Sequence, residues 1–168
     1  ESGTLLCESR SDELQCQLRA GTLMKKGAMF NFSLITRAKD DKLHSTIYWG
    51  NNTQLTYSGK IDAIASFRQD SLKRVLHTRV DIQPSQVILN DTTWNIHPAT
   101  VDIAKDSIEI HDFLFEHRDQ HLKINGRLGK TEADSCLVDL KNINLLYIMD
   151  MIQFHAVRFD GGISGKVH

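Results

Sequence analysis

Proline is scarce in this sequence, with only Pro84 and Pro98 among 168 residues. Because proline removes a backbone donor and interrupts the hydrogen-bond ladder of a sheet, its scarcity favours long strands. Long hydrophobic runs are also lacking, since no stretch approaches the roughly 18 apolar residues of a membrane-spanning helix. The first residues, Glu1 to Thr4, do not have the features of a secretory signal peptide.

An excess of one charge sign is absent too, because 20 Lys and Arg stand against 21 Asp and Glu. The two signs alternate along the chain, so nucleic acid and anionic membrane surfaces are not expected partners. The GxSxG, HExxH and phosphate-loop motifs are missing as well. We therefore expect no enzymatic activity, no catalytic residue and no cofactor.

Cysteine is limited to Cys7, Cys16 and Cys136, and no CxxC pair occurs. Cys7 and Cys16 could lie on neighbouring strands and form a bridge. Alternatively, Cys16 and Cys136 fall in the apolar phase of their segments, where each would serve as a small core residue. The odd count neither establishes nor excludes an oxidising compartment.

Histidines and acidic residues give no convincing site. His117 and His121 have a spacing that suits metal ligands on a helix, but Arg118-Asp119-Gln120 between them predicts a hairpin turn, so we expect no metal. Five acidic residues fall on the polar phase of predicted strands, where they suppress edge association: Asp62, Asp81, Asp102, Glu109 and Asp139.

What the sequence has in abundance is alternation of apolar and polar residues. From Leu55 to Phe67 every second residue is apolar or small, and the residues between them are polar except for Ile64. This period of two predicts a strand with one apolar face. At about 3.3 Å per residue the segment would span roughly 43 Å, over twice the usual strand length. Such a strand favours an elongated sheet with a continuous apolar face.

The same alternation recurs along most of the chain, and turn residues such as Asp40-Asp41 and Asn90-Asp91 separate the runs. Between Ile110 and Phe113 the apolar parity changes, which predicts a bulge near His111 or Asp112. The sequence thus predicts an all-β fold of ten or eleven mostly antiparallel strands, in a curved, taco-like or half-open-barrel groove.

One helix is predicted near residues 144–153, where Leu145, Ile148, Met149 and Ile152 share a helical face. No linker divides the chain, so residues 1–168 are expected to form one β-groove segment. Because the alternation is already present at Leu5 and continues to Val167, we expect this segment to be an internal piece of a longer protein.

A sheet with one apolar face must cover it with a second sheet, with helices or with a ligand, and one short helix cannot cover ten strands. Two arrangements remain open, a sheet folded on itself around a filled core and a groove partly open around acyl chains. The residues expected to line the shared interior are Leu55, Tyr57, Ile61, Leu76, Val80, Val101, Ile103, Ile108, Ile110, Phe113, Phe115, Leu122 and Ile124.

The last 75 or so residues carry a rhythm of strand, short break, strand and glycine. Its parts are Trp94-x-Ile96-x-Pro98, Val101-x-Ile103, Ser107-Ile108-Glu109-Ile110-x-x-Phe113, Gln120-x-Leu122-x-Ile124-x-Gly126, Asp139 to Leu146 and Phe159-Asp160-Gly161-Gly162-Ile163-Ser164-Gly165. This rhythm resembles that of the TamB family, the translocation and assembly module proteins, and their AsmA-like relatives.

The resemblance implies a segment of a long periplasmic protein of a Gram-negative bacterium, anchored in the inner membrane by a part outside this chain. Its partners would be phospholipid or another acyl-chain ligand, and an outer-membrane barrel protein of the assembly machinery. The function would be to carry lipid between membranes or to assist outer-membrane protein assembly. Two other interpretations remain, a non-catalytic β-sandwich scaffold or adhesion domain and an LptA-like lipopolysaccharide-binding protein.

Overall fold

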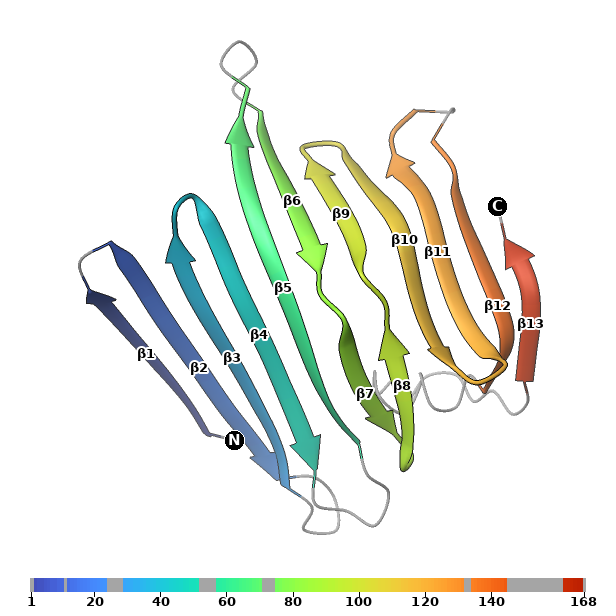
Figure 1. Ribbon diagram of the computed structural model, residues 1–168, viewed down its shortest axis with the longest axis horizontal. Coiled ribbons are helices and arrows are strands. Elements are labelled where there is room, and N and C mark those ends of the chain that lie inside the picture. The colour runs from blue at the N-terminus through green and yellow to red at the C-terminus, as the bar shows by residue number, and fades with distance from the viewer. Residues whose placement is uncertain are drawn as a thin grey trace.

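The computed structural model describes residues 2–10, 12–23, 29–51, 57–70, 75–131, 134–144 and 162–167. These residues form a single antiparallel sheet of thirteen strands, which confirms the all-β prediction (Figure 1). The strands are β1 (Ser2–Arg10), β2 (Glu13–Leu23), β3 (Met29–Lys39), β4 (Lys42–Asn51), β5 (Ser58–Gln69), β6 (Leu76–Ile82), β7 (Ser85–Leu89), β8 (Thr92–Ile96), β9 (Ala99–Ala104), β10 (Ser107–His117), β11 (Gln120–Gly129), β12 (Cys136–Asn144) and β13 (Gly162–Val167).

Most neighbours in the sheet are also neighbours in the sequence, as expected for strands joined by short hairpins. Asp40-Asp41 joins β3 to β4 and Asn90-Asp91 joins β7 to β8. All four residues have φ between 51° and 57°, the conformation of the tight turns that match strand twist. The turn chemistry that the sequence predicted at these positions is therefore confirmed.

The long predicted strand is displaced by a few residues. β5 covers Ser58 to Gln69 without a break, whereas the alternation predicted Leu55 to Phe67. Tyr57 precedes the strand, and Leu55 lies outside the described residues. Asn144 ends β12, while the rest of the predicted helix, residues 145–153, also lies outside the described part.

The strand count exceeds the predicted ten or eleven because a single hairpin from Leu76 to Ala104 is divided at its two prolines. Ile82 pairs with Ala99 and Ser85 pairs with Ile96, which leaves Gln83-Pro84 opposite His97-Pro98. Neither proline can donate to the ladder, so the hairpin becomes β6–β9 on one side of the break and β7–β8 on the other.

The bulge predicted near His111 or Asp112 is present. β10 shifts register against β11 between Ile110 and Phe113, and Asp112 has a φ of 57°. It lies level with the proline break, since His111 pairs with Thr100. The regular strand pairing is thus interrupted at the same height of the sheet in three adjacent segments, Gln83-Pro84, His97-Pro98 and His111-Asp112. We call this line across the sheet the crease.

The crease keeps the apolar side chains on one side of the sheet. Along β5, which has no bulge, Ala63 pairs with Ile82 of β6 and Gly59 pairs with Val87 of β7. Opposite residues of an antiparallel pair point to the same side, so the even-numbered face of β6 continues as the odd-numbered face of β7. A regular strand would have turned Val87 to the other face.

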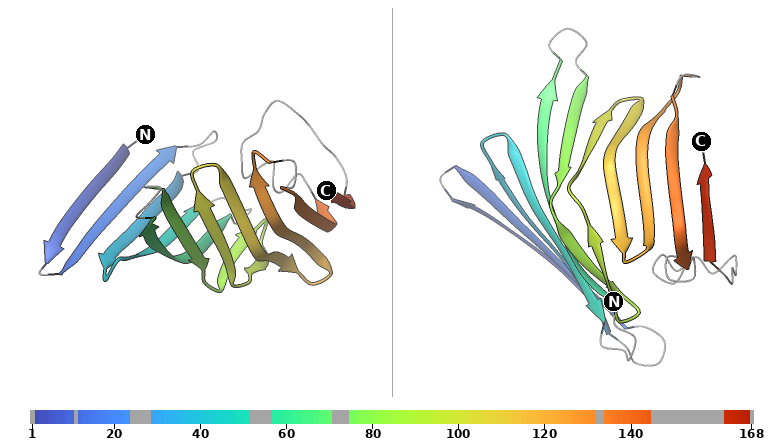
Figure 2. Two further views of the ribbon diagram at one scale, coloured as in Figure 1. Left: turned by 90° about the horizontal axis from the view of Figure 1, so that it is seen from above. Right: turned by 45° about the vertical axis from the view of Figure 1, so that its right-hand side comes forward.

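The sheet is twisted and curved rather than flat. In Figure 2 the N-terminal strands β1–β4 run at a clear angle to the C-terminal strands β10–β12. Right-handed strand twist accumulates across many strands in this way. The buried core lies in the β7–β8 half of the long hairpin, at the lower end of the sheet in Figure 1.

Candidate apolar groove

Register places an unbroken ladder of large aliphatic residues across the first five strands. Leu5 pairs with Leu18, Leu18 with Leu34, Leu34 with Ile47 and Ile47 with Ile61. Each of these side chains therefore points to the same face, which we call the apolar face.

The predicted lining residues share this face. In the strands, Ile61, Leu76, Val80, Val101, Ile103, Ile108, Ile110, Phe113, Phe115, Leu122 and Ile124 occupy its positions. Tyr57 precedes β5 and packs against the core cluster, and Leu55 lies outside the described residues. The structure thus brings together every predicted lining residue that it describes.

Sequence reasoning missed the buried part of this face, at its lower end. Val87, Leu89, Trp94 and Ile96 of β7 and β8 are at most 6% exposed and form the buried core with Ile143. Their parity is opposite to that of the β6 and β9 residues, so simple alternation separates the two groups. Pro84 and Pro98 were the available signal, since a proline within a strand marks a bulge or a break.

Charge is excluded from the apolar face. At its paired positions in the described strands there is no Lys, Arg, Asp or Glu; the polar residues there are neutral ones such as Thr36, Ser45 and Thr78, with His117 near the lower end. A face of this composition has no charge to neutralise a charged ligand, and its many aliphatic and aromatic side chains suit hydrocarbon.

Exposure changes along the strands of this face. Between β8 and β10, whose paired ends lie toward the lower end of the sheet in Figure 1, Trp94 stacks on Phe115 with ring centroids 4.8 Å apart, and Trp94 is 1% exposed. At the upper end, Phe67, Thr78, Ile103, Ile108 and Leu128 form one row across five strands. The four large residues of that row are 38% to 51% exposed. The face is therefore filled at one end and open at the other.

The opposite face, the polar face, holds the charged residues in pairs. Lys60 contacts Asp62 at 2.8 Å, Arg79 contacts Asp81 at 3.2 Å, and His111 and His121 lie beside Asp102 and Asp139. These acids therefore lie on the polar side, as the sequence predicted.

Asp62 is the most firmly held of these carboxylates. Its burial opposes ionisation, but hydrogen bonds from Lys60 and Thr46 and the charge of Lys60 outweigh burial and lower the pKa of Asp62. The Thr46 hydroxyl donates to Asp62 Oδ1 at 2.6 Å. The charges of the polar face are thus partnered on the sheet itself.

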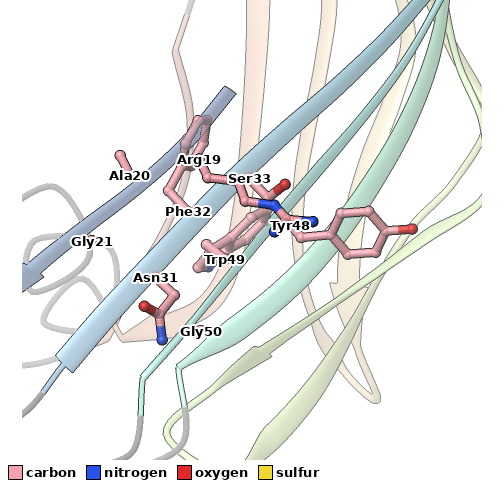
Figure 3. Close-up of a pocket in the computed structure, with 9 residues that line it drawn as sticks. All are labelled: Arg19, Ala20, Gly21, Asn31, Phe32, Ser33, Tyr48, Trp49 and Gly50. Atoms are coloured by element: carbon pink, nitrogen blue, oxygen red, sulfur yellow. The ribbon is translucent and has the colours of Figure 1, made fainter. Parts of the chain in front are cut away.

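A hollow of about 430 Å³ lies at the lower end of β2, β3 and β4 (Figure 3). The residues that line it are Arg19, Ala20, Gly21, Asn31, Phe32, Ser33, Tyr48, Trp49 and Gly50. Ala20 pairs with Phe32 and Phe32 with Trp49, so these three belong to the apolar face. In Figure 3 Tyr48 points away from Ala20, consistent with its position on the polar face. The aromatic residues extend the apolar face toward β2.

The cysteine alternatives are resolved in favour of the bridge at the edge. Cys7 and Cys16 are directly opposed on β1 and β2, with Cα atoms 4.2 Å apart, and form a disulfide. Cys136 is a free, half-buried thiol on β12.

The other candidate chemistry is not assembled. His117 and His121 flank a hairpin turn on opposite faces of the sheet, since His117 pairs with Gln120. Within the described residues no group of three His, Cys, Asp or Glu is placed to hold a metal ion. The same part of the chain contains no helix long and apolar enough to cross a bilayer.

Comparison of the chain with protein-family models, curated proteins and solved structures found no match.

Proposed function

We propose that the apolar face of this sheet carries the acyl chains of lipids, within a periplasmic envelope protein of the TamB type that moves phospholipid between membranes. The observation that carries the proposal is the uncharged apolar face that extends over the sheet and remains exposed at its upper end. No catalytic residue, cofactor or metal is part of this proposal.

The energetics of apolar contact support it. Each methylene group removed from water contributes about 0.8 kcal/mol, so a sixteen-carbon chain could gain on the order of 10 kcal/mol before the cost of ordering it. Seven exposed large hydrophobic residues lie on this face: Leu5, Leu14, Phe67, Leu76, Ile103, Ile108 and Leu128. Contact with them requires no particular headgroup, which suits a carrier of many lipids.

The disulfide supports the compartment. Disulfides persist in oxidising environments such as the bacterial periplasm and are rare in the cytosol. The Cys7–Cys16 bridge lies on an exposed edge hairpin, where a reducing compartment would open it readily.

Assistance of outer-membrane protein assembly is a second candidate. Among the strands that the structure describes, β1 pairs with β2 alone and β13 with β12 alone, so these two strands form the edges of the sheet. A sheet edge can align an incoming strand by backbone hydrogen bonding, as barrel assembly would need.

Photo-crosslinking in cells tests the lipid proposal. A photoreactive amino acid at Ile110 points to the apolar face, and one at the neighbouring Glu109 points to the polar face. We expect lipid adducts, identified by mass spectrometry, at Ile110 and at Ile61 but not at Glu109. Absence of lipid adducts at both Ile61 and Ile110 would favour a scaffold with a filled core.

A further inference from the structure

The apolar face has two ends of different character. Along β9 the exposed fraction rises from 7% at Ala99 to 38% at Ile103. We define the closed end by the buried residues Val87, Leu89, Trp94, Ile96 and Ile143, and the open end by the exposed residues Phe67, Leu76, Ile103, Ile108 and Leu128. The crease separates the two.

Side chains of the protein already occupy the closed end. The Trp94 ring stacks on Phe115, and Ile61, Phe115 and Leu122 pack against the buried cluster. A ligand could reach this layer only by displacing well-packed groups. The layer therefore acts as a wall across the groove.

Between the wall and the open end the side chains are smaller. Ala65 pairs with Val80, Val80 with Val101, Val101 with Ile110 and Ile110 with Gly126, all on the apolar face. None of these five residues is among the buried core residues. This row continues the apolar face from the exposed row to the wall.

Charge restricts what can lie there. The paired positions of this face hold no charged group, so a charged headgroup has no ionic partner on it and is more stable where water and charged groups are. The hairpin tips beyond the open end provide these groups: Lys130 of the β11 end contacts Asp106 of the β9–β10 turn.

On the basis of the proposed function, we infer that the lipid site is the open end, formed by β5, β6, β9, β10 and β11. Long-chain diacyl phospholipids bind there with their acyl chains parallel to the strands. The layer formed by Ile61, Ile96 and Phe115 stops the chain ends. From Phe67 to Ile61 the six-residue step is roughly 20 Å at a rise of about 3.3 Å per residue. With C–C bonds of about 1.5 Å in a zigzag, this is about the length of an extended sixteen-carbon chain.

Two phosphatidylcholine probes test the orientation and the stop on the unmodified chain. One carries a diazirine next to the acyl ester and the other carries it at the chain end. After irradiation and peptide mapping, we expect the first to label the level of Phe67, Ile103 and Ile108, and the second to label the level of Ile61 and Ala63. Identical labelling by the two probes, reversed labelling, or labelling mainly on β1–β4 would overturn the inference and leave the proposed function standing.

A matched pair of substitutions on β5 adds a second measurement. Ala65→Trp fills the row between the wall and the open end, whereas Ser66→Trp adds the same side chain on the polar face. We expect the adduct yield to fall at least tenfold in Ala65→Trp and to be unchanged in Ser66→Trp. An unchanged yield in both would contradict the site. If sedimentation shows a dimer and the dimer takes up no lipid probe, a second copy of the chain covers the apolar face instead of lipid. Absence of any adduct on the unmodified chain would overturn the proposed function itself.

Discussion

At the scale of single residues, Gly59 shows how one side chain packs against the sheet. Trp49 pairs with Gly59 across β4 and β5, and the indole covers the glycine so closely that a Cβ there would overlap the ring. Glycine is therefore needed at this position because an aromatic ring occupies the space, and the ring in turn covers the backbone of β5.

We predict that Gly59→Ala destabilises the protein by about 1–3 kcal/mol, because Trp49 must leave its position. Urea denaturation measures the loss, and a change in tryptophan emission would report the movement of the ring. Gly50→Ala is the control, since its Cβ would meet only Ser58 Cβ at 3.6 Å, an ordinary contact. Equal stability of the two variants would contradict this account.

The carboxylate of Asp62 links Thr46 and Lys60 on the polar face. Its pKa is lowered in the folded protein, so its ionised form stabilises the fold above the unfolded pKa of about 3.9, and this contribution is lost as pH falls through the folded pKa.

We predict that Asp62→Asn costs about 1 kcal/mol at pH 7 and that the difference from the unmodified protein shrinks below about pH 4. Urea titrations between pH 7 and pH 3 would measure it. Asp41→Asn, in the exposed β3–β4 turn, is the control and should change stability little at any of these pH values. A pH-independent difference for Asp62→Asn would contradict the role of its charge.

At the scale of elements, the bulge at Asp112 decides which face the second half of β10 presents. Ile110 and Phe113 both lie on the apolar face only because β10 has two residues, His111 and Asp112, opposite the single residue Asn125 of β11. Asp112 itself has a φ of 57°, which asparagine, aspartate and glycine tolerate best.

We predict that Asp112→Gly changes stability by less than about 0.5 kcal/mol, whereas deletion of Asp112 costs about 3 kcal/mol or more. Deletion would turn Phe113 and Phe115 toward the polar face and remove Phe115 from its stack with Trp94. Thermal denaturation of the two variants distinguishes them, and a stable deletion variant would show that the bulge does not set the register.

The edge hairpin β1–β2 depends on its disulfide. Every described side chain of β1 is exposed, and its ion pair, Arg10 with Glu8, lies within β1 itself and does not tie it to β2. Apart from the backbone ladder, the Cys7–Cys16 bridge is therefore the main link between these strands.

We predict that reduction with dithiothreitol speeds amide exchange throughout β1 and costs about 2–3 kcal/mol locally. Hydrogen exchange would detect this, with β11 as an internal reference and Cys136→Ser as the control that should change nothing. Strong protection of the β1 and β13 amides from exchange in the reduced monomer would instead indicate that both edge strands are stable without the disulfide and without pairing to another strand.

At the scale of the whole molecule, the separation of an uncharged face from a charged one is the property on which the lipid proposal rests. The described residues form one layer of sheet, so no second sheet among them covers the apolar face.

We predict that Ile61→Arg blocks binding of an acyl-chain probe and lowers stability by a few kcal/mol, because it places an unpaired charge against the core cluster. Ser66→Arg, on the polar face of the same strand, should leave probe binding unchanged, although its position opposite Lys42 and Arg79 costs some stability through like-charge repulsion. Lipid binding by Ile61→Arg at the level of the unmodified chain would indicate that the apolar face is not the binding surface.

Alternation of residue types determined the fold class, the β10 bulge and the set of residues that share the apolar face, because a period of two fixes the direction of a side chain within any regular strand. Turn residues such as Asn90-Asp91 also determined where the chain reverses, since their φ preferences are local.

Only the tertiary structure decided how the faces connect across the crease and which end is filled. Both depend on pairing between residues that are distant in the sequence. The Gln83-Pro84 segment lies opposite His97-Pro98, and Trp94 stacks on Phe115. No local pattern specifies such pairing, so the buried core of β7 and β8 could not be predicted from alternation, whereas the apolar face around it could.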